Sequence, residues 1–161
     1  MSKFDIFNGD ADGICALIQF RNAFPASSVL ITGVKRDINL VEKQSYGGDD
    51  ELLVLDVSYD KNREGVAAAL AAGASVRYFD HHFAGDIQVH SELETHINTE
   101  SNICTALLVN GYLKGAFALW AVVGAFGDNL RDSALALAKS LDLNSEQLGD
   151  LEKLGMNLNI T

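Results

Sequence analysis

The stretch Glu51–Val57 reads Glu-Leu-Leu-Val-Leu-Asp-Val and is the part of the sequence that decides the fold class. Its branched and aliphatic side chains predict a strand. Apolar residues occupy consecutive positions, so both faces of that strand are expected to be buried. Such a strand is typical of the middle of a parallel sheet, because helices cover both faces there. We therefore expect an α/β fold with three layers, αβα, around a mainly parallel sheet.

Strand and helix patterns alternate on both sides of this central stretch. The other predicted strands are Lys3–Asn8, Val29–Val34, Ser75–Phe79 and Leu93–Asn98. The predicted helices between the strands are Asp12–Phe24, which stops before Pro25, a weaker helix over Asp37–Gln44, and Lys61–Ala72, which Gly73 closes. From Ser101 onward the pattern is helical, with breaks expected at Gly111, Gly115, Gly127 and Gly149. The sequence thus predicts about five strands, right-handed crossovers and a helical C-terminal part.

The composition favours a packed globular protein and limits the classes of partner that it can bind. Of the 161 residues, 48% are hydrophobic and 1 is proline, which argues against a disordered chain. Asp and Glu number 22 against 12 Lys and Arg, which gives a net charge of −10. Binding of long nucleic acid needs clustered Lys and Arg, so we do not expect it from this chain by itself. A small phosphorylated substrate stays compatible, since metal ions can supply positive charge in an acidic pocket.

Neither the cysteines nor the apolar segments point to export or to a membrane. Cys15 and Cys104 lack metal-ligand spacing and are too few for a disulfide framework, so we expect a reducing cytoplasm. The N-terminal apolar run contains an acid, Asp5, unlike a signal peptide. The most apolar stretch, Lys114–Asp128, is too short to span a hydrocarbon core of about 30 Å as a helix. A buried helix is the better interpretation.

Acids and histidines cluster directly after three of the predicted strands. Asn8–Gly13 (Asn-Gly-Asp-Ala-Asp-Gly) follows the first strand, Asp56 ends the third, and Asp80–His82 (Asp-His-His) ends the fourth. In an open parallel sheet, ligands bind in the crevice outside the carboxyl ends of the strands. Three clusters at that one edge predict a binding site there, because solvated acids on helices would be scattered.

This mixture of carboxylates and imidazoles suits a divalent metal ion. Carboxylates that lie close together repel each other unless a cation neutralises them. Mixed Asp and His ligands favour Mn²⁺, Fe²⁺, Co²⁺ or Zn²⁺ over Ca²⁺. Two such ions about 4 Å apart can clamp a phosphoryl oxygen and generate a hydroxide nucleophile. Asp56, alone on the central strand, is the natural bridging ligand for such a pair.

Three other interpretations of the first cluster account for less of the sequence. An EF-hand loop would need Glu rather than Gln19 at its twelfth position, and a helix rather than a strand before it. A phosphatase of the haloacid-dehalogenase type, with Asp-x-Asp after a strand, leaves Asp80–His82 unexplained. A plain helix cap and tight turn at Gly13 explains one of Asp10 and Asp12 but not both acids.

The order of these motifs resembles that of the DHH phosphoesterase superfamily. Asp80–His82 supplies the Asp-His-His motif, with Asp10–Gly13 (Asp-Ala-Asp-Gly) and Asp56 upstream of it. Gly124–Asn129 (Gly-Ala-Phe-Gly-Asp-Asn) is similar to the family's fourth motif, an Asp in a glycine-containing turn after a buried helix. The likeness covers roughly residues 3–130. Members include RecJ-type exonucleases, oligoribonucleases that also dephosphorylate pAp, cyclic-di-AMP phosphodiesterases and family II inorganic pyrophosphatases.

The resemblance implies a role for each motif residue. One metal ion would be held by Asp10 and Asp56, with Asn8 where many members have His. The implied ligands of a second ion are Asp12, Asp56, His81 and Asp128. Asp80 would orient a histidine, and His82 would face the substrate phosphate or the leaving oxygen. Asp80 and His82 are thus the implied catalytic residues.

Substrate contacts are expected from the same edge of the sheet. Lys35 and Arg36 lie just past the second predicted strand, where they can meet a phosphate, although a solvated turn explains them equally well. Adjacent residues at a strand end point in different directions. His81 and His82 are therefore not expected to share one ion.

Two departures from the family pattern bear on function. Asn8 is a neutral and weaker ligand than His, which leaves open whether one or two ions bind. Members usually carry a second, smaller C-terminal domain, and this sequence ends about where the connecting helix would run. We expect residues 1–145 to form the DHH catalytic, metal-binding domain. Residues 146–161 are expected to form a helical tail or the start of a linker to an absent second domain.

The sequence and the resemblance together predict a Mn²⁺-dependent phosphoesterase, with Mg²⁺ or Co²⁺ as alternative ions. It would hydrolyse a phosphodiester or phosphomonoester of a small nucleotide or short oligonucleotide by attack of metal-bound hydroxide. Two alternatives stay open. One is an inorganic pyrophosphatase or polyphosphatase, and the other is a non-catalytic metal-binding module that needs a missing domain or partner. No membrane partner is expected, and a homodimer is compatible with the sequence.

Overall fold

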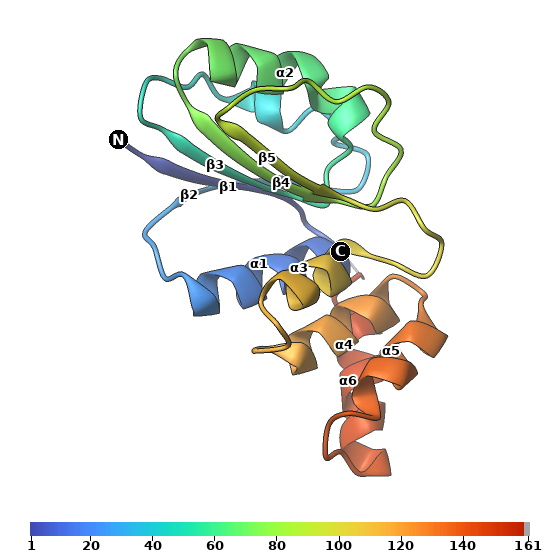
Figure 1. The fold of residues 1–161 in the computed structure, drawn as a ribbon. Coiled ribbons are helices and arrows are strands. Elements are labelled where there is room, and N and C mark those ends of the chain that lie inside the picture. The colour runs from blue at the N-terminus through green and yellow to red at the C-terminus, as the bar shows by residue number, and fades with distance from the viewer. Residues whose placement is uncertain (160–161) are drawn as a thin grey trace.

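A five-stranded sheet with helices on both faces is the framework of the computed structural model, which describes residues 1–159 (Figure 1). The strands are β1 (Lys3–Asn8), β2 (Val29–Gly33), β3 (Glu51–Leu55), β4 (Ser75–Asp80) and β5 (Leu93–Ile97). Their order is β2-β1-β3-β4-β5, and every neighbouring pair is parallel. The predicted α/β fold is confirmed, and β3 is the central strand.

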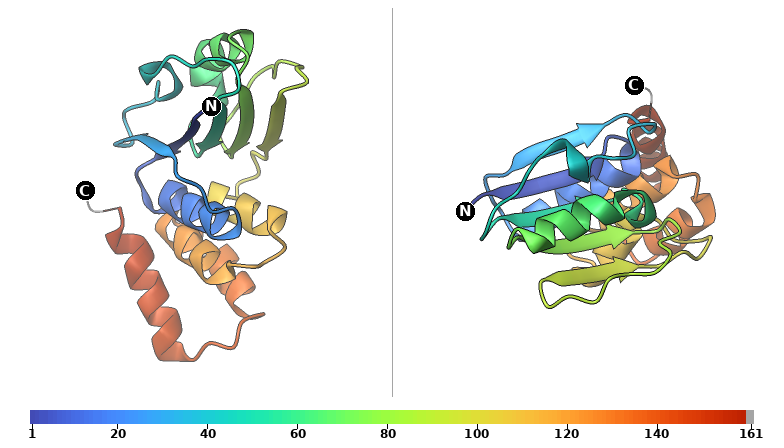
Figure 2. Two further views of the ribbon diagram at one scale, coloured as in Figure 1. Left: turned by 90° about the vertical axis from the view of Figure 1, so that its left-hand side faces the viewer. Right: turned by 90° about the horizontal axis from the view of Figure 1, so that it is seen from above.

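The helices form a layer on each face of the sheet (Figures 1 and 2). The helical elements are α1 (Ala11–Ala23), the 3₁₀ turn η1 (Val41–Lys43), α2 (Tyr59–Ala71), α3 (Thr105–Tyr112), α4 (Ala118–Gly127), α5 (Arg131–Ala138) and α6 (Ser145–Asn157). One face carries α2 and η1, whereas α1 and α3 lie on the other. Beyond them, α4 packs against α1 and α3, and α5 and α6 pack against α4. This is the three-layer arrangement with a helical C-terminal part that the sequence predicts.

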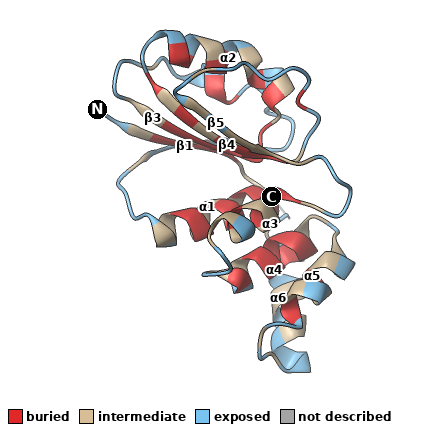
Figure 3. Cartoon of the chain, in the orientation of Figure 1, coloured by how far each residue is buried: buried red, intermediate tan, exposed pale blue. Residues whose placement is uncertain are grey.

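The central strand is buried on both faces, as its sequence predicts (Figure 3). Leu52 and Val54 belong to the apolar core between the sheet and α2, and Leu53 and Leu55 belong to the core between the sheet and α1 and α3. A third core joins α4, α5 and α6 to α1 and α3. Packing on both sides therefore fixes the carboxyl end of β3, where the predicted site lies.

The segment Asp37–Gln44 is not the weak helix that its sequence predicts, since only η1 forms there. The side chain of Asn62 in α2 explains the difference. It accepts a hydrogen bond from the Val41 N–H and donates one to the Ile38 carbonyl. These bonds satisfy backbone groups that would otherwise pair within a helix.

Of the four predicted glycine breaks in the C-terminal part, the one at Gly149 is wrong, and the one at Gly111 comes one residue before α3 ends at Tyr112. Gly111 lies inside α3 and Gly149 inside α6, and a side chain at either position would meet nothing within 4 Å. A glycine inside a helix costs about 1 kcal/mol, which the packing of the helix offsets. Gly115 does break the chain between α3 and α4, at a φ of 76°, and Gly127 is the last residue of α4.

The C-terminal helix α6 lies against α4. The predicted division into residues 1–145 and 146–161 stays a prediction, and residues 160–161 of that tail lie outside the described residues. No helix within residues 1–159 is both long enough and apolar enough to cross a membrane.

Candidate metal centre

The predicted site lies at the carboxyl ends of β1 and β3 (Figure 1). The connections that follow these two strands run to opposite faces of the sheet. The chain passes from β1 through α1 to β2 on one side, and from β3 through α2 to β4 on the other. Ligands bind at such a switch point because the diverging connections leave a crevice. Asn8 ends β1, Asp56 follows β3 and Asp80 ends β4. The strand order therefore brings the three predicted clusters to one edge.

Two backbone features place the acids at this crevice. Asp56 has a φ of 61°, a left-handed conformation that residues other than glycine rarely adopt, and it turns the chain away from β3. Gly13, in the first turn of α1, lies so close to β1 that a Cβ there would stand 2.1 Å from the Asn8 carbonyl oxygen. Only glycine permits this approach, which sets Asp10 and Asp12 beside the end of β1.

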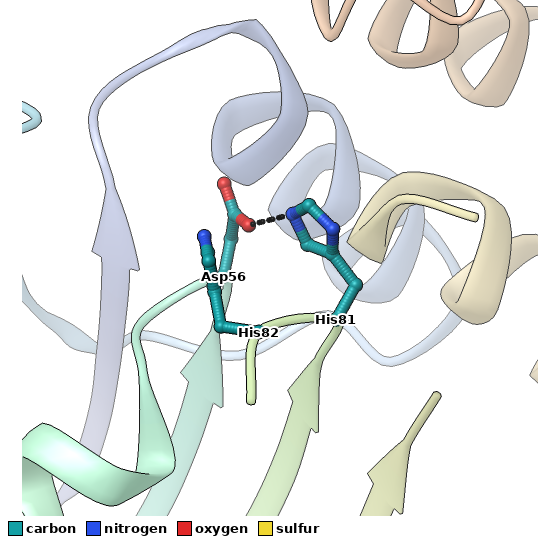
Figure 4. A group of neighbouring side chains, drawn as sticks. All are labelled: Asp56, His81 and His82. Carbon is teal, nitrogen blue, oxygen red and sulfur yellow. Dashed lines mark ion pairs between the residues drawn. The ribbon is translucent and has the colours of Figure 1, made fainter. Parts of the chain in front are cut away.

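The imidazole of His81 lies among three carboxylates. Its Nε2 atom is 3.1 Å from an oxygen of Asp56, 3.4 Å from one of Asp12 and 3.9 Å from one of Asp128. Figure 4 shows Asp56 and His81 turned toward one another from neighbouring strand ends. Asp12 and Asp56 are buried, whereas Asp128 is partly exposed at the end of α4. The four residues that the resemblance assigns to one ion are adjacent.

The N-terminus of α3 fixes two of these carboxylates. Asp12 accepts hydrogen bonds from the N–H groups of Thr105 (3.0 Å) and Ala106 (2.7 Å), and the Thr105 hydroxyl donates to Asp56 at 3.1 Å. Free amides and the helix dipole both favour a negative charge at this end of a helix. The role of Thr105 was not predicted from the sequence. The feature that could have indicated this role is an apolar helix that starts at Thr105 and has no acidic residue in its first turn.

Asp80 orients His82 rather than His81. One oxygen of Asp80 is 2.6 Å from Nδ1 of His82, and this hydrogen bond is the main cause of the raised pKa of His82. The ring centroids of His81 and His82 are 4.4 Å apart, and both rings offer nitrogen atoms near Asp56 (Figure 4). The prediction that the two histidines point apart is therefore wrong, because the bond to Asp80 holds His82 beside its neighbour.

Asn8 and Asp10, implied as ligands of the other ion, lie at the same crevice. Asp10 caps α1, since one of its oxygens accepts from the Gly13 N–H at 3.0 Å. The side-chain oxygen of Asn8 is buried without a hydrogen-bond partner among residues 1–159, and so is the second oxygen of Asp80. A buried acceptor without a partner costs about 1–3 kcal/mol, and the unpaired oxygen of Asn8 fits its implied role as a metal ligand.

The carboxylates at this site are held in unfavourable surroundings. Burial raises the pKa of Asp56 well above its usual range, and the charges of Asp12 and Asp10 raise it further. Burial also raises the pKa of Asp12. The pKa of Asp128 rises to about 7, again through burial first and then through the same two acids. Burial lowers the pKa of the His81 imidazole, so this ring does not readily supply a compensating charge.

A divalent cation fits this arrangement. Within the described part of the chain, two groups of side chains offer ligand atoms that all lie within 4.8 Å of one another: Asp56, His81 and His82, and Asp12, His81 and Asp128. Deprotonated carboxylates and neutral imidazoles are the forms that bind metal. A cation would supply the positive charge that the buried acids lack, and this mixed donor set is one that Mn²⁺, Co²⁺ and Zn²⁺ accept.

Comparison with solved structures shows which known fold this chain shares. No family model and no curated protein sequence matches the chain. Among solved structures, the DHH domain of a member of a family of ribosomal proteins matches with a TM-score of 0.69 and 13% identity, over 98% of this chain and 47% of that one. This chain has the fold of a DHH domain. The predicted resemblance is thereby confirmed at the level of the fold.

Two structures of the exonuclease RecJ share this DHH fold. RecJ bound to manganese matches with a TM-score of 0.51 and 14% identity, over 94% of this chain and 50% of that one. RecJ from Thermus thermophilus, in complex with Mn²⁺, matches with a TM-score of 0.50 and 17% identity, over 99% of this chain and 32% of that one. The chain therefore spans half or less of the length of each of these three structures.

Beside the acids, the DHH fold of this chain leaves a cleft of about 560 Å³. Its lining includes seven predicted site residues: Asn8, Asp10, Lys35, Asp56, His81, His82 and Asp128. Asp12 is buried next to it and reaches His81. The structure therefore brings together all the residues that the sequence and the resemblance nominate as metal ligands.

Two lysines line this cleft. Lys35 does so as predicted, whereas Arg36 is exposed and is not among the lining residues. Lys35 and Arg36 stand in one turn, which hydrogen bonds between Val34 and Asp37 close. Of the two residues, only Lys35 lines the cleft. Lys61, in the first turn of α2, also lines the cleft and was missed in the sequence. The feature of the sequence that could have indicated Lys61 is its position just after the turn at Asp56.

Proposed function

We propose that this chain is a divalent-metal-dependent phosphoesterase that uses Mn²⁺. The observation that carries the proposal is the cluster of Asp12 and Asp56, both buried, and the partly exposed Asp128 around His81, with separations of 3.1–3.9 Å to its Nε2 atom. Buried like charges at one sheet edge are kept for a cation, since they cost stability otherwise. The DHH fold supports the proposal, because RecJ structures of that fold are bound to manganese.

The residues present suggest how the ions would be held. Asp12, Asp56, His81 and Asp128 are the ligands proposed for one ion, and Asn8, Asp10 and Asp56 are those proposed for the other. When bound, such ions neutralise phosphate charge, polarise a phosphoryl oxygen and lower the pKa of water. Asp56 is the bridging ligand in this proposal, and its carboxylate is already oriented by the Thr105 hydroxyl.

His82 is the proposed proton donor to the leaving oxygen. Asp80 accepts from its Nδ1, which leaves Nε2 for the cleft that His82 lines. The raised pKa of His82 favours the protonated ring, which can hydrogen-bond a phosphate oxygen and give up a proton. Lys35 and Lys61 would attract the phosphate of the substrate into the same cleft.

The proposed substrate is a phosphodiester or phosphomonoester of a small nucleotide or short oligonucleotide. A cleft of about 560 Å³ is of the size that holds small ligands. The chain's net charge of −10 disfavours a grip on long nucleic acid, whose backbone contacts need many cations. Pyrophosphate and polyphosphate are alternative substrates that the same site geometry would suit. The assay therefore includes pyrophosphate.

The test compares three alanine variants of the Mn²⁺-loaded chain. His82→Ala is expected to keep its metal and its fold but to lose at least about 100-fold in kcat on a small phosphodiester, because a positioned acid contributes that much. His81→Ala is expected to lose metal as well. His90→Ala is the matched control, since His90 lies outside the cleft and its ring accepts a hydrogen bond from the Glu92 N–H.

Three outcomes contradict parts of this proposal. A parent chain that is inert toward phosphodiesters, pAp and pyrophosphate at saturating Mn²⁺ favours the non-catalytic metal-binding module. Activity on pyrophosphate alone favours a pyrophosphatase. Equal rates for the parent and His82→Ala refute the role given to His82.

A further inference from the structure

The turn that follows α6 reaches the metal centre through one side chain, that of Asn159. Its oxygen accepts a hydrogen bond from the Ala11 N–H at 2.8 Å, and its NH₂ group donates to the Gly127 carbonyl at 2.5 Å. Ala11 stands between two proposed ligands, Asp10 and Asp12, and Gly127 precedes a third. One amide group therefore bridges the two turns that carry these acids.

Glycines let α6 come close enough for this bridge. A Cβ at Gly155 of α6 would stand 2.4 Å from the Val123 carbonyl oxygen and 2.9 Å from the Gly127 nitrogen. A Cβ at Gly127 would stand 2.3 Å from the Ala11 Cβ. The three helices α1, α4 and α6 thus meet with no room for another methyl group. Their contact fixes the end of α6 beside the start of α1.

The backbone groups that Asn159 binds have no partner inside their own helices. The Ala11 N–H belongs to the first turn of α1, where the Asp10 side chain caps Gly13 instead. The Gly127 carbonyl belongs to the last turn of α4. Helix ends are commonly capped by residues next to them, whereas Asn159 is 148 positions from Ala11. The bridge is a tertiary contact between distant segments.

The bridged turns carry acids that repel one another. Asp10 and Asp128 line a common cavity of about 250 Å³, together with Asn159 and Lys35. Like charges at such short range push their segments apart unless something holds them. Asn159 is neutral, and it opposes that separation with one donor and one acceptor.

We propose that Asn159 is a positioning residue of the metal centre, which holds the Asp10–Asp12 turn and the Asp128 turn at the separation that a bound cation requires. The inference rests on the proposed function, because it takes these acids to be metal ligands. Ligands that are held in place before binding lower the ordering cost of binding. Residues that orient metal ligands typically change metal affinity by about 10- to 100-fold when they are removed.

The test is calorimetric titration of the metal-free chain with Mn²⁺. Asn159→Ala is expected to weaken Mn²⁺ binding about tenfold. Asn157→Ala is the matched control, because Asn157 is exposed at the last position of α6, two residues before Asn159, and is not part of the bridge. The control is expected to bind like the parent. A purely structural role would lower the urea midpoint of Asn159→Ala and leave Mn²⁺ affinity unchanged, and that result overturns the proposal.

A second measurement needs no variant. The Ala11 amide of the metal-free parent is expected to exchange with deuterium at least about tenfold more slowly than an unprotected amide, because Asn159 accepts its proton. Exchange at the unprotected rate overturns the proposal, even if Asn159→Ala does not fold.

Neither readout uses hydrolysis, so the two proposals fail separately. A parent chain that binds Mn²⁺ and hydrolyses no phosphoester contradicts the proposed function, and the role of Asn159 is then decided by affinity and exchange. A parent chain that binds no Mn²⁺ overturns both.

Discussion

Buried carboxylates occur at both ends of strand β1, and the two ends neutralise them differently. At the amino end, Asp5 is 1% exposed and accepts two hydrogen bonds from the Arg21 guanidinium, one of them 2.9 Å from Nε. At the carboxyl end, Asp12 is equally buried and Asp56 nearly so. Within residues 1–159 the basic group next to both is the imidazole of His81, whose pKa is lowered by burial, so that its charged form is disfavoured.

We interpret the difference as separating an acid that stabilises the fold from acids that the proposed function reserves for binding a cation. A planar guanidinium satisfies a carboxylate with two parallel bonds and always carries its charge. Acids that are buried with too little positive charge destabilise the folded chain until a cation binds, which is typical of functional sites. The amino end of β1 is therefore expected to lose stability when its acid is removed, and the carboxyl end to gain it.

The largest expected effect is at the amino end. Asp5→Asn is expected to lower the free energy of unfolding by about 3–5 kcal/mol, because it leaves a largely buried guanidinium without its partner. Urea denaturation of the metal-free chain measures this. Asp60→Asn is the control, since its pair with Arg63 is partly exposed and such pairs contribute about 0–1 kcal/mol. Equal losses in the two variants would show that Asp5 and Arg21 are no more coupled than a surface pair.

Metal binding is the next largest effect and separates the two ends. At a Mn²⁺ concentration of about 100 times Kd, the ion is expected to stabilise the folded chain by about 2.7 kcal/mol, or about 5–10 °C in Tm. Asp56→Asn is expected to lose most of this increment, whereas Asp5→Asn keeps it in full. Thermal melts with and without Mn²⁺ measure the difference. An identical increment in both variants contradicts the bridging role of Asp56.

The smallest expected effect has the opposite sign to the first. The pKa of Asp128 is raised from 3.8 to about 7 in the folded chain, so the folded state holds a proton that the unfolded state releases between these values. Its contribution to stability is therefore present below about pH 4 and is lost as the pH rises through about 7. Asp128→Asn is expected to remove this loss and to stabilise the metal-free chain by about 1 kcal/mol at pH 7.5.

Urea denaturation in EDTA at pH 5 and pH 7.5 checks this sign. The gain in the free energy of unfolding from Asp128→Asn is expected at pH 7.5. It is expected to be smaller at pH 5, where Asp128 of the folded parent is largely protonated. In Mn²⁺ the order reverses, because the variant lacks a ligand. A variant that is less stable than the parent in EDTA at pH 7.5 would show that Asp128 is a structural residue.

The same two ends show what the sequence can reveal. Apolar runs with the period of strands predict β1, β3 and β4, and strand order then brings Asp56 and His81 to one edge. The pair of Asp5 and Arg21 was not predicted, because it joins a strand to a helix 16 residues away through packing alone. A local pattern carries no record of which distant side chains meet.

Contacts made by backbone groups are equally hidden from the sequence. Thr105 and Asn159 reach the site through hydrogen bonds to or from main-chain atoms, across 93 and 148 positions. Lys61 lines the cleft from the first turn of α2, which begins at Tyr59, two residues before the predicted start at Lys61. The ligand types were readable from the residues, whereas the groups that hold them depend on how the helices pack.

The bonds from the start of α3 to Asp12 also bear on how fast ions exchange. Two amides and the Thr105 hydroxyl already hold the carboxylates of Asp12 and Asp56, so an ion that binds at the proposed site would need no helix to move and few side chains to turn. Its entry is then governed by diffusion and by the loss of its own water shell. Differences in affinity among variants of this site would accordingly reside in the rate of ion release rather than in the rate of capture.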